Sequence, residues 1–325
     1  MKIAVDAMGG DNGSKIVIEA IKEFKKIYPN DEVIAFGKKE ELEELSSICR
    51  IVDAPDVVPM EAGALEVMRM KNSSMCKAIN TMKEEGFDAV VSAGSTGGFL
   101  SASTIILKTI PGVKRAALVT AFPTKVKGKK VVILDVGASN DNSPEELVQF
   151  AYMGKAYNEA LYKTAEPKTY LLSNGSEDHK GSPLVKETFK LLKEKQFEGF
   201  VGNMEARDVL SGDADILVAD GFSGNILLKG MEGIAKMFGS LIKGAFKKNL
   251  WTKLGYLHVR KGFNNISETF DYKSVGGAML VGVNGVVIKA HGNSDTYSFT
   301  GALKVAHQMV ENDTVNKIKE ALANG

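Results

Sequence analysis

Six short segments of this chain combine glycine with hydroxyl, amide or carboxylate side chains, and each follows an apolar run. They are residues 6–11, 92–98, 135–140, 202–207, 220–225 and 291–294. Glycine lets the backbone approach a ligand closely, while serine, threonine and asparagine add neutral donors. At a helix N-terminus such donors favour an anion. A tight turn explains any single segment, but six of them together predict a site for a phosphate or a developing oxyanion.

Signatures of several other chemistries are missing from the sequence. No dinucleotide-binding G-x-G-x-x-G follows the first apolar run, and neither a P-loop G-x-x-x-x-G-K-[ST] nor a nucleophile elbow G-x-S-x-G occurs. The histidines, which lack the spacing of metal ligands, are His179, His258, His291 and His307. We therefore expect neither a cofactor nor a metal ion.

The composition is that of an ordinary globular protein. The 325 residues are 44% hydrophobic and 25% charged, which suits one large core. A net charge of +1 gives no general attraction to nucleic acid, so we expect no such partner. Only two cysteines occur, and no apolar stretch approaches the roughly 20 residues of a membrane span. These features favour a cytoplasmic protein.

Short apolar runs alternate with amphipathic stretches along the chain. Strands are expected at 2–6, 33–37, 48–53, 89–92, 131–136, 169–173, 199–202, 216–219 and 279–288, the last with a turn near Asn284-Gly285. The main helices are expected from Ser14 onward and at 97–108, 144–157 and 299–319. This alternation predicts an α/β fold, with a mostly parallel sheet and helices on both faces. We expect one catalytic domain, 1–325, with all six segments at one edge, beyond the carboxyl ends of the strands.

A basic amphipathic helical extension is expected at about 233–267. This stretch has no acidic residue, and its lysines and arginines alternate with apolar residues at roughly helical spacing. Such a segment meets a membrane interface or an acidic partner, although a core-facing helix with a solvated lysine face has the same pattern. A second basic patch comprises Lys125, Lys127, Lys129 and Lys130.

In their order along the chain, the segments resemble the bacterial phosphate acyltransferase of phospholipid synthesis, nearly from end to end. The most specific matching pieces are 6–11, 134–138, 149–154, 220–225 and 282–292. The resemblance implies a fold similar to that of the isocitrate dehydrogenase and phosphotransacetylase group. It also implies that a long acyl chain moves from acyl carrier protein onto inorganic phosphate, without a redox cofactor. A membrane glycerol-3-phosphate acyltransferase would then use the acyl phosphate.

The same resemblance implies a homodimer that works at an anionic membrane surface, peripherally on the inner face of the cell membrane. The family has a hydrophobic hairpin, thought to touch lipid, at the tip of the extension. Trp251, Leu254 and Leu257 are therefore the expected membrane contacts. Because acyl carrier protein is acidic, either the extension or the second basic patch is expected to dock it.

Three residues are assigned to catalysis. Lys180 precedes a predicted helix and matches a lysine of the family, which assigns it to the phosphate or the oxyanion; a solvated lysine is the alternative. Asp220 ends an apolar strand, so we expect it either to orient Lys180 or the phosphate, or to cap the next helix. Asn225 is a neutral donor. A thiolate leaving group, with a pKa of about 8.5, requires neither a strong general acid nor an acyl-enzyme.

The remaining candidates are expected to bind phosphate or substrate. They are Asp6, Gly9, Gly10, Ser95, Thr96, Gly97, Gly137, Asn203, Arg207, Gly221, Gly224 and His291. Asp6 and Asp135 could instead cap their own loops, and His291 could shuttle a proton or only support the structure.

The chain departs from the family pattern at five positions. They are Ser95, Gly98, Ser139, Ala206 and Met279. Because the changes keep small or neutral character, we expect the activity to survive them.

Two other functions share part of this pattern. A short-chain phosphotransacetylase using coenzyme A thioesters needs the same phosphate loops, together with a small acyl pocket and a nucleotide site. A non-catalytic scaffold could bring acyl carrier protein to the membrane, but docking alone does not need ordered phosphate loops.

Overall fold

The computed structural model describes residues 1–247, 252, 259 and 276–324. The strands are β1 (Lys2–Asp6), β2 (Glu32–Gly37), β3 (Arg50–Asp53), β4 (Ala89–Ser92), β5 (Ala117–Pro123), β6 (Lys130–Leu134), β7 (Thr169–Ser173), β8 (Phe200–Glu205), β9 (Ile216–Val218), β10 (Ala278–Val281) and β11 (Val286–Lys289). The helices are α1 (Gly13–Ile27), α2 (Ala64–Arg69), α3 (Ser74–Glu84), α4 (Thr96–Leu107), α5 (Pro144–Tyr162), α6 (Pro183–Glu194), α7 (Gly221–Lys247), α9 (Thr296–Glu311) and α10 (Thr314–Ala323). Two short 3-10 helices are η1 (Glu43–Leu45) and η2 (Ala206–Ser211).

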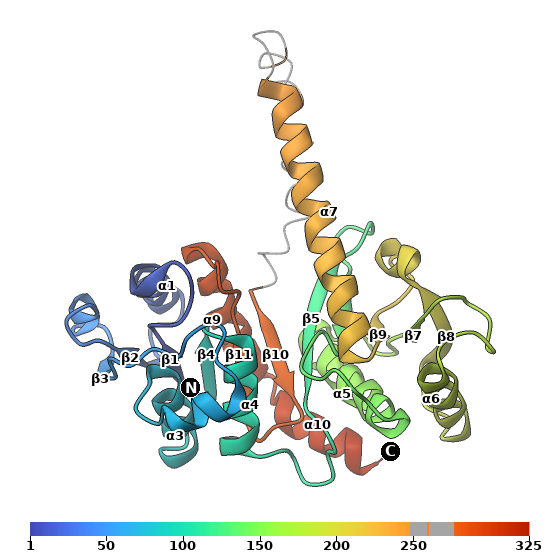
Figure 1. Cartoon of the computed structure of the whole chain (residues 1–325), viewed down its shortest axis with the longest axis horizontal. Helices are drawn as coiled ribbons and strands as arrows, with labels where there is room; N and C mark the ends of the chain where they lie inside the picture. The colour runs from blue at the N-terminus through green and yellow to red at the C-terminus, as the bar shows by residue number, and fades with distance from the viewer. Residues whose placement is uncertain (248–251, 253–258, 260–275, 325) are drawn as a thin grey trace.

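The described strands form one sheet, in the order β3-β2-β1-β4-β11-β10-β5-β6-β9-β7-β8 (Figure 1). Among them, the antiparallel neighbours are β11 with β10, β10 with β5, and β5 with β6. The other neighbours are parallel. The prediction of a mostly parallel α/β sheet is confirmed, as is the antiparallel turn near Asn284-Gly285.

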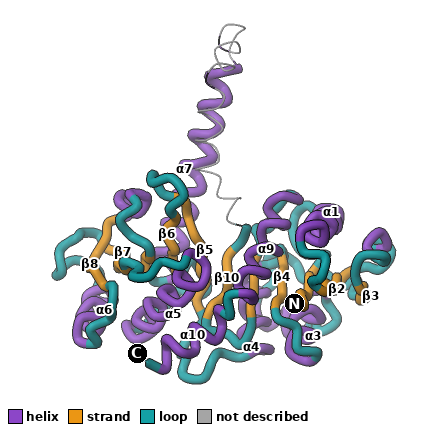
Figure 2. The backbone as a smooth tube through the Cα atoms, turned by 180° about the vertical axis from the view of Figure 1, so that it is seen from behind, coloured by secondary structure: helices purple, strands orange, loops and turns teal. Residues whose placement is uncertain are grey.

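Two apolar clusters lie on the two faces of the sheet, because alternate residues of a strand point to opposite faces. On β5, Val119 belongs to the cluster that also contains buried residues of α1, α5, α6, α9 and α10. Leu118 and Phe122 belong to the other cluster, together with residues of α2, α3, α4 and the base of α7. Helices therefore cover both faces, as predicted (Figure 2).

The strands fall into two halves that run in opposite directions. Three antiparallel pairings separate β11 from β6, so β6, β7, β8 and β9 point opposite to β1, β2, β3, β4 and β11. The expectation that all six glycine-rich segments share one edge is therefore wrong. Segments 6–11, 92–98 and 291–294 follow strands of the first half, and the other three follow strands that point toward the opposite edge. Strand β5, which the sequence analysis did not predict, takes part in two of the three antiparallel pairings, and its insertion between β10 and β6 causes this reversal.

Helix α7 crosses one face of the sheet and then projects well beyond it (Figure 1). Near its base, Leu227, Leu228 and Met231 pack against the apolar cluster on that face. Further along, four apolar side chains at helical spacing leave 52–61% of their surface exposed. They are Ile234, Met237, Phe238 and Leu241.

Helix α7 also carries the first part of the predicted extension, and that part is helical as far as Lys247. The expected membrane contacts Trp251, Leu254 and Leu257 lie outside the described residues. Among the residues described, no helix combines the length and the hydrophobicity needed to cross a membrane.

The prediction of a single C-terminal helix at 299–319 is wrong, because the segment forms two helices, α9 and α10. Asp295 caps α9 by accepting a hydrogen bond from the Ser298 backbone N–H at 2.9 Å. After α9 ends, Asp313 adopts a left-handed conformation with φ of 52°, which interrupts the α-helix before α10 begins. The pattern concealed this break, because Met309 and Ile318 on either side of it are buried in the same cluster.

Candidate active site

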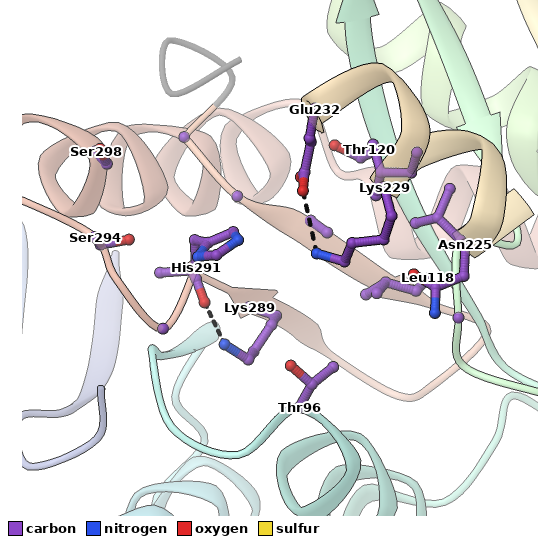
Figure 3. A pocket seen from close by; sticks show the side chains of 18 of the residues that line it. Thr96, Leu118, Thr120, Asn225, Lys229, Glu232, Lys289, His291, Ser294 and Ser298 are labelled. Atoms are coloured by element: carbon purple, nitrogen blue, oxygen red, sulfur yellow. Dashed lines mark hydrogen bonds and ion pairs between the residues drawn. The ribbon is translucent and has the colours of Figure 1, made fainter. Parts of the chain in front are cut away.

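A pocket with a volume of about 430 Å³ lies between the two halves of the sheet (Figure 3). Its walls come from the N-terminus of α4, from β5, from the segment after β11, and from the base of α7. The residues that line it include Thr96, Leu118, Thr120, Phe122, Val136, Asn225, Leu228, Lys229, Glu232, Lys289, His291, Ser294 and Ser298.

The N-terminus of α4 forms one wall of the pocket. Ser95 caps the helix, since its hydroxyl accepts a hydrogen bond from the Gly98 N–H at 3.2 Å, and Ser95 itself is buried. Thr96 and Gly97 then occupy the first turn and line the pocket. Backbone N–H groups of a first turn have no acceptor within the helix, so this wall suits an anion. Ser95 therefore has a capping role, whereas Thr96 and Gly97 are placed to meet a ligand.

Strand β11 ends in a buried lysine at the same pocket. Lys289 is only 6% exposed, and its ammonium donates a hydrogen bond to the Ala290 carbonyl oxygen. Burial lowers the pKa of Lys289 to about 8, against the opposing effect of the Asp6 and Asp11 charges. The sequence analysis missed this residue. A lysine that ends an apolar strand two residues before His291 was the available signal.

His291 lies in the pocket above Lys289 (Figure 3). Its Nδ1 accepts a hydrogen bond from the Asn293 N–H at 3.3 Å, which leaves Nε2 to carry the proton in the neutral ring. Burial lowers the pKa of His291, and the charges of Lys229 and Lys289 lower it further against the opposing effect of Glu232. A neutral donor at this position suits a phosphate oxygen.

Helix α7 contributes an amide and an ion pair. Asn225 lines the pocket close to Gly137, where a β-carbon would come within 3.2 Å of the Asn225 amide carbon. Gly137, with φ of 125°, therefore permits this close approach. One and two turns further on, Lys229 and Glu232 form an ion pair at 3.1 Å, in which the Glu232 side chain is only 10% exposed. The sequence analysis predicted neither Lys229 nor Glu232, because both look like ordinary helix-surface charges.

Asp135 organises the loop that brings Gly137 to the pocket. Its carboxylate accepts hydrogen bonds from the backbone N–H groups of Leu118, Gly137, Ala138 and Ser139 at 2.9–3.1 Å, and from the Ser139 hydroxyl at 2.8 Å. Burial raises the pKa of Asp135, and these hydrogen bonds oppose that effect. Asp135 thus caps its own loop, which was one of the two expectations for it.

The path of this loop explains how segment 135–140, which follows a strand of the second half of the sheet, reaches a pocket whose other walls include segments of the first half. Leu134, the last residue of β6, pairs with Val119 in the middle of β5, so the chain leaves the sheet before reaching its edge. The Val136 backbone N–H then donates a hydrogen bond to the Leu118 carbonyl oxygen, which places Gly137 on the face of the sheet beside β5. A β-carbon on Gly221 or Gly224 would lie 2.0 Å from a carbonyl of this loop. Both glycines therefore serve close packing of α7 on the loop, and neither lines the pocket.

Asp6 lies behind the pocket rather than in it. Its carboxylate, 1% exposed, accepts hydrogen bonds from the Ser74 and Ser92 hydroxyls, each at 2.6 Å. A β-carbon on Gly9 would meet the Gly94 nitrogen at 2.5 Å, and one on Gly10 would meet the Gly292 carbonyl oxygen at 3.0 Å. Segment 6–11 therefore packs against segments 92–98 and 291–294, which contribute residues to the pocket wall.

The Lys180 region forms a separate cluster at the ends of β7 and β8. Lys180 is exposed, and the buried Asn203 amide donates to the Glu177 and Lys180 carbonyls at 2.9 and 3.5 Å. Arg207 pairs with Glu205 and is 77% exposed. Lys180, Asn203 and Arg207 do not line the pocket described above.

Asp220 caps α7, because its carboxylate accepts a hydrogen bond from the Ser223 N–H at 2.9 Å. Among the described residues, no ion pair joins Asp220 to Lys180. The structure thus brings together Thr96, Gly97, Gly137, Asn225 and His291. The other residues predicted to bind or act on the substrate form caps and supporting contacts around this pocket or lie at the Lys180 cluster. In the same part of the chain, no three His, Cys, Asp or Glu side chains are arranged to hold a metal ion.

Comparison with known proteins connects this arrangement to one family. Residues 1–317 match the family described as "Fatty acid synthesis protein". The chain is 43% identical over 329 aligned positions to a phosphate acyltransferase of an Exiguobacterium species, covering 99% of each chain. It is 40% identical to a phosphate acyltransferase of Clostridium perfringens, covering 99% of this chain and 97% of that one.

Solved structures share the fold at much lower identity. A branched-chain phosphotransacylase from Enterococcus faecalis superposes with a TM-score of 0.63 at 15% identity, covering 95% of this chain and 99% of that one. A phosphotransacetylase from Streptococcus pyogenes gives a TM-score of 0.59 at 19% identity, covering 99% and 94%. These similarities concern the fold alone, and they agree with the fold group expected from the sequence.

Proposed function

The chain belongs to the fatty acid synthesis protein family, and on this premise we propose that it moves a long-chain acyl group from acyl carrier protein onto inorganic phosphate. It is an acyltransferase with phosphate as the acyl acceptor, in line with the name of relatives that are 37–43% identical over nearly the whole chain. The product, an acyl phosphate, serves phospholipid synthesis. A membrane glycerol-3-phosphate acyltransferase is its proposed consumer.

One observation carries this proposal beyond the family: the pocket has a polar end and an apolar wall. Thr96, Lys289 and His291 surround the polar end, which suits phosphate. The apolar wall comprises Leu118, Phe122, Val136 and Leu228, which suit a hydrocarbon chain. A long-chain acyl thioester would thus place its hydrocarbon chain along the apolar wall and its carbonyl group at the polar end, next to the phosphate.

The chemistry requires positioning more than acid or base strength. An oxygen of the phosphate dianion HPO₄²⁻ attacks the thioester carbonyl, and a tetrahedral oxyanion forms. The C–S bond then breaks, the sulfur takes its electron pair, and the thiolate receives the proton that the phosphate carried. The protein's part is to bind the phosphate against the carbonyl and to stabilise the oxyanion with fixed donors.

The predicted residues take different parts in this proposal. Asn225 and His291 face the phosphate as neutral donors, and the α4 N-terminus with Thr96 binds an oxygen. Lys180 and Asp220 remain proposed catalytic residues because they match the family pattern. Lys180 lies outside the pocket, so its role requires the acyl carrier protein, a second subunit or a closure of the two halves to bring it to the reacting atoms.

The decisive experiment uses the purified chain with palmitoyl-acyl carrier protein and inorganic phosphate. We expect acyl phosphate and free acyl carrier protein in equal amounts, with hydroxylamine trapping the product as the hydroxamate. Acetyl-coenzyme A replaces the donor in a parallel reaction. Turnover of acetyl-coenzyme A alone would establish the short-chain phosphotransacetylase instead, and turnover of neither donor would favour the scaffold.

We also propose a homodimer. The stripe formed by Ile234, Met237, Phe238 and Leu241 on the projecting part of α7 supports a subunit contact, because residues at this spacing lie on one helix face and are exposed in the single chain. Sedimentation equilibrium would measure the state directly. A monomer at micromolar concentration would contradict the proposal.

Peripheral contact with an anionic membrane on the inner face of the cell membrane is proposed for the tip of the extension, at Trp251, Leu254 and Leu257. Burying two leucines in an interface is worth roughly 3–6 kcal/mol, and each nearby lysine adds about 1 kcal/mol. The double variant Leu254→Glu with Leu257→Glu should therefore release the protein from anionic vesicles while turnover without lipid stays near normal. Co-sedimentation with vesicles measures the release. If dimerisation and turnover were lost together, the tip would be a subunit interface.

A further inference from the structure

We propose that Lys289 is the cation that binds the acceptor phosphate, and that the Ser294 hydroxyl is a neutral donor to the same phosphate. Neither residue was among the site residues expected from the sequence. The inference rests on the proposed function, since it names the residues that hold the acceptor of that reaction.

The first observation is that Lys289 is a buried cation without a carboxylate partner. It is 6% exposed, yet the described residues offer its ammonium only the Ala290 carbonyl as a hydrogen-bond acceptor, although an ammonium has three donors. A buried charge that lacks a partner is costly. An anion in the pocket would supply both the missing acceptors and the missing charge.

The second, independent observation is an unpaired hydroxyl on the same wall. Ser294 is 2% exposed and lines the pocket, and its Oγ has no hydrogen-bond partner among the described residues. Its backbone is held in place, because its N–H donates to the His291 carbonyl at 3.0 Å and its carbonyl accepts from the Asn12 amide at 2.8 Å. The backbone of Ser294 is thus fixed beside the pocket, and a ligand oxygen would satisfy its hydroxyl.

The surrounding charges favour a single bound anion at this end. The charges that act on Lys289 are those of Asp6 from β1, Asp11 from the following loop and Lys229 from α7, while Glu232 and His291 line the same pocket. Asp6 accepts hydrogen bonds from two serine hydroxyls, Glu232 is paired with Lys229, and Asp11 is exposed to solvent. Figure 3 shows Thr96, in the first turn of α4, close to Lys289. The Lys289 ammonium and the N-terminus of α4 are therefore the groups that attract the phosphate.

Lys289 assists the acyl transfer without gaining or losing a proton. The ammonium and the Ser294 hydroxyl bind two oxygens of HPO₄²⁻, and a third oxygen attacks the thioester carbon. A new O–C bond forms, the C–S bond breaks, and the phosphate proton passes to the thiolate. Lys289 keeps its own proton throughout, so its work is binding and orientation.

The variant Lys289→Met tests this role, because methionine keeps the length of the side chain and removes its charge. Loss of one buried, charge-assisted hydrogen bond should raise the KM for inorganic phosphate at least about tenfold, with a smaller effect on the KM for the acyl donor. Titration calorimetry with inorganic phosphate alone should show the same loss of affinity. Lys155→Met is the matched control, because Lys155 is a largely buried lysine on α5 outside the pocket.

A pH series separates phosphate binding from a structural role. With a pKa of about 8, Lys289 is charged at pH 7 and mostly neutral at pH 9. Phosphate affinity of the unchanged protein should therefore fall about tenfold between these pH values, whereas that of Lys289→Met should stay nearly flat. Unchanged phosphate affinity in a folded Lys289→Met protein would overturn the proposal. So would a pH dependence equal to that of the unchanged protein.

The outcomes also distinguish this inference from the proposed function. If the unchanged protein forms no acyl phosphate, the proposed function fails, whatever Lys289 does. If the unchanged protein is active and Lys289→Met retains its phosphate KM, only the inference fails. If Lys289→Met does not fold, Lys289→Gln and phosphate binding by Ser294→Ala provide the same comparison, and normal phosphate affinity in both would again reject it.

Discussion

Two regions of the molecule each contain a lysine and a hydroxyl that lacks a partner, yet the two regions differ in their surroundings. In the first, Lys289 ends β11 and is 6% exposed, and Ser294 lines the same pocket. In the second, Lys180 follows β7 and is exposed, near Ser173, whose hydroxyl also lacks a partner among the described residues. The two strands run in opposite directions.

Burial rather than residue type therefore decides what such a lysine can do in the single chain. A charge in a low-dielectric pocket interacts with an anion far more strongly than the same charge in water. Lys289 can therefore bind phosphate in the single chain as it stands. Lys180 needs a partner protein or a movement of the two halves to remove it from water. If both act, we expect the first to control phosphate affinity and the second to control turnover.

The largest expected effect tests the second region. Lys180→Met should keep the fold but lower kcat by at least ~100-fold, the scale of losing one charged contact to an oxyanion. The KM for phosphate should change little, in contrast to Lys289→Met. Steady-state kinetics with acyl carrier protein thioester measures both parameters. Near-normal turnover in a folded variant would remove Lys180 from the reaction.

The next effect concerns stability, and it separates the two lysines without any substrate. Burial lowers the pKa of Lys289 from 10.5 to about 8, so between these pH values the folded state binds fewer protons than the unfolded state. The cost of the buried charge is thus fully present below pH 8 and disappears as the pH rises to 10.5. Lys289→Met should raise the free energy of unfolding at pH 7 by about 1–3 kcal/mol, and by much less at pH 10.5.

Urea denaturation without phosphate measures this difference, with Lys180→Met as the comparison. No change is expected in the Lys180 variant, because that side chain is exposed. A Lys289→Met protein less stable than the unchanged one at pH 7 would mean that the ammonium supports the fold.

A third, smaller effect concerns the helix that lies between the two regions. Asp220 caps α7 and Asn225 lines the pocket one turn later. If both position phosphate, Asp220→Asn and Asn225→Ala should each lower kcat/KM by about tenfold, and the double variant should be little worse than the poorer single one, because groups acting as a unit are not additive. Defects that multiply would assign the two residues to separate steps.

The smallest effect compares the two unpaired hydroxyls. Ser294→Ala should weaken phosphate binding by about fivefold, the range of one neutral hydrogen bond. Ser173→Ala should leave phosphate binding unchanged, because Ser173 lies outside the pocket. Calorimetry with inorganic phosphate measures both. The reverse pattern would move the phosphate site to the Lys180 region.

Much of the fold and part of the site could be predicted from the sequence. Strands such as Ala89–Ser92 and helices such as α4 follow from local apolar periodicity and from caps, which are properties of neighbouring residues. The glycine and hydroxyl pattern likewise predicted Thr96, Gly97, Gly137, Asn225 and His291, which the structure brings to one pocket. The order of the motifs indicated the family to which the chain belongs.

Only the tertiary structure decided which of the predicted residues meet. Strand β5 adds a third antiparallel pairing between the two halves, so segments of similar composition leave the sheet in opposite directions. Lys289 ends an apolar run and Lys180 lies in a polar segment, but only contacts with distant segments bury the first and leave the second exposed. Strand direction and burial depend on contacts between residues far apart in the chain, and no local pattern of residue types records those contacts.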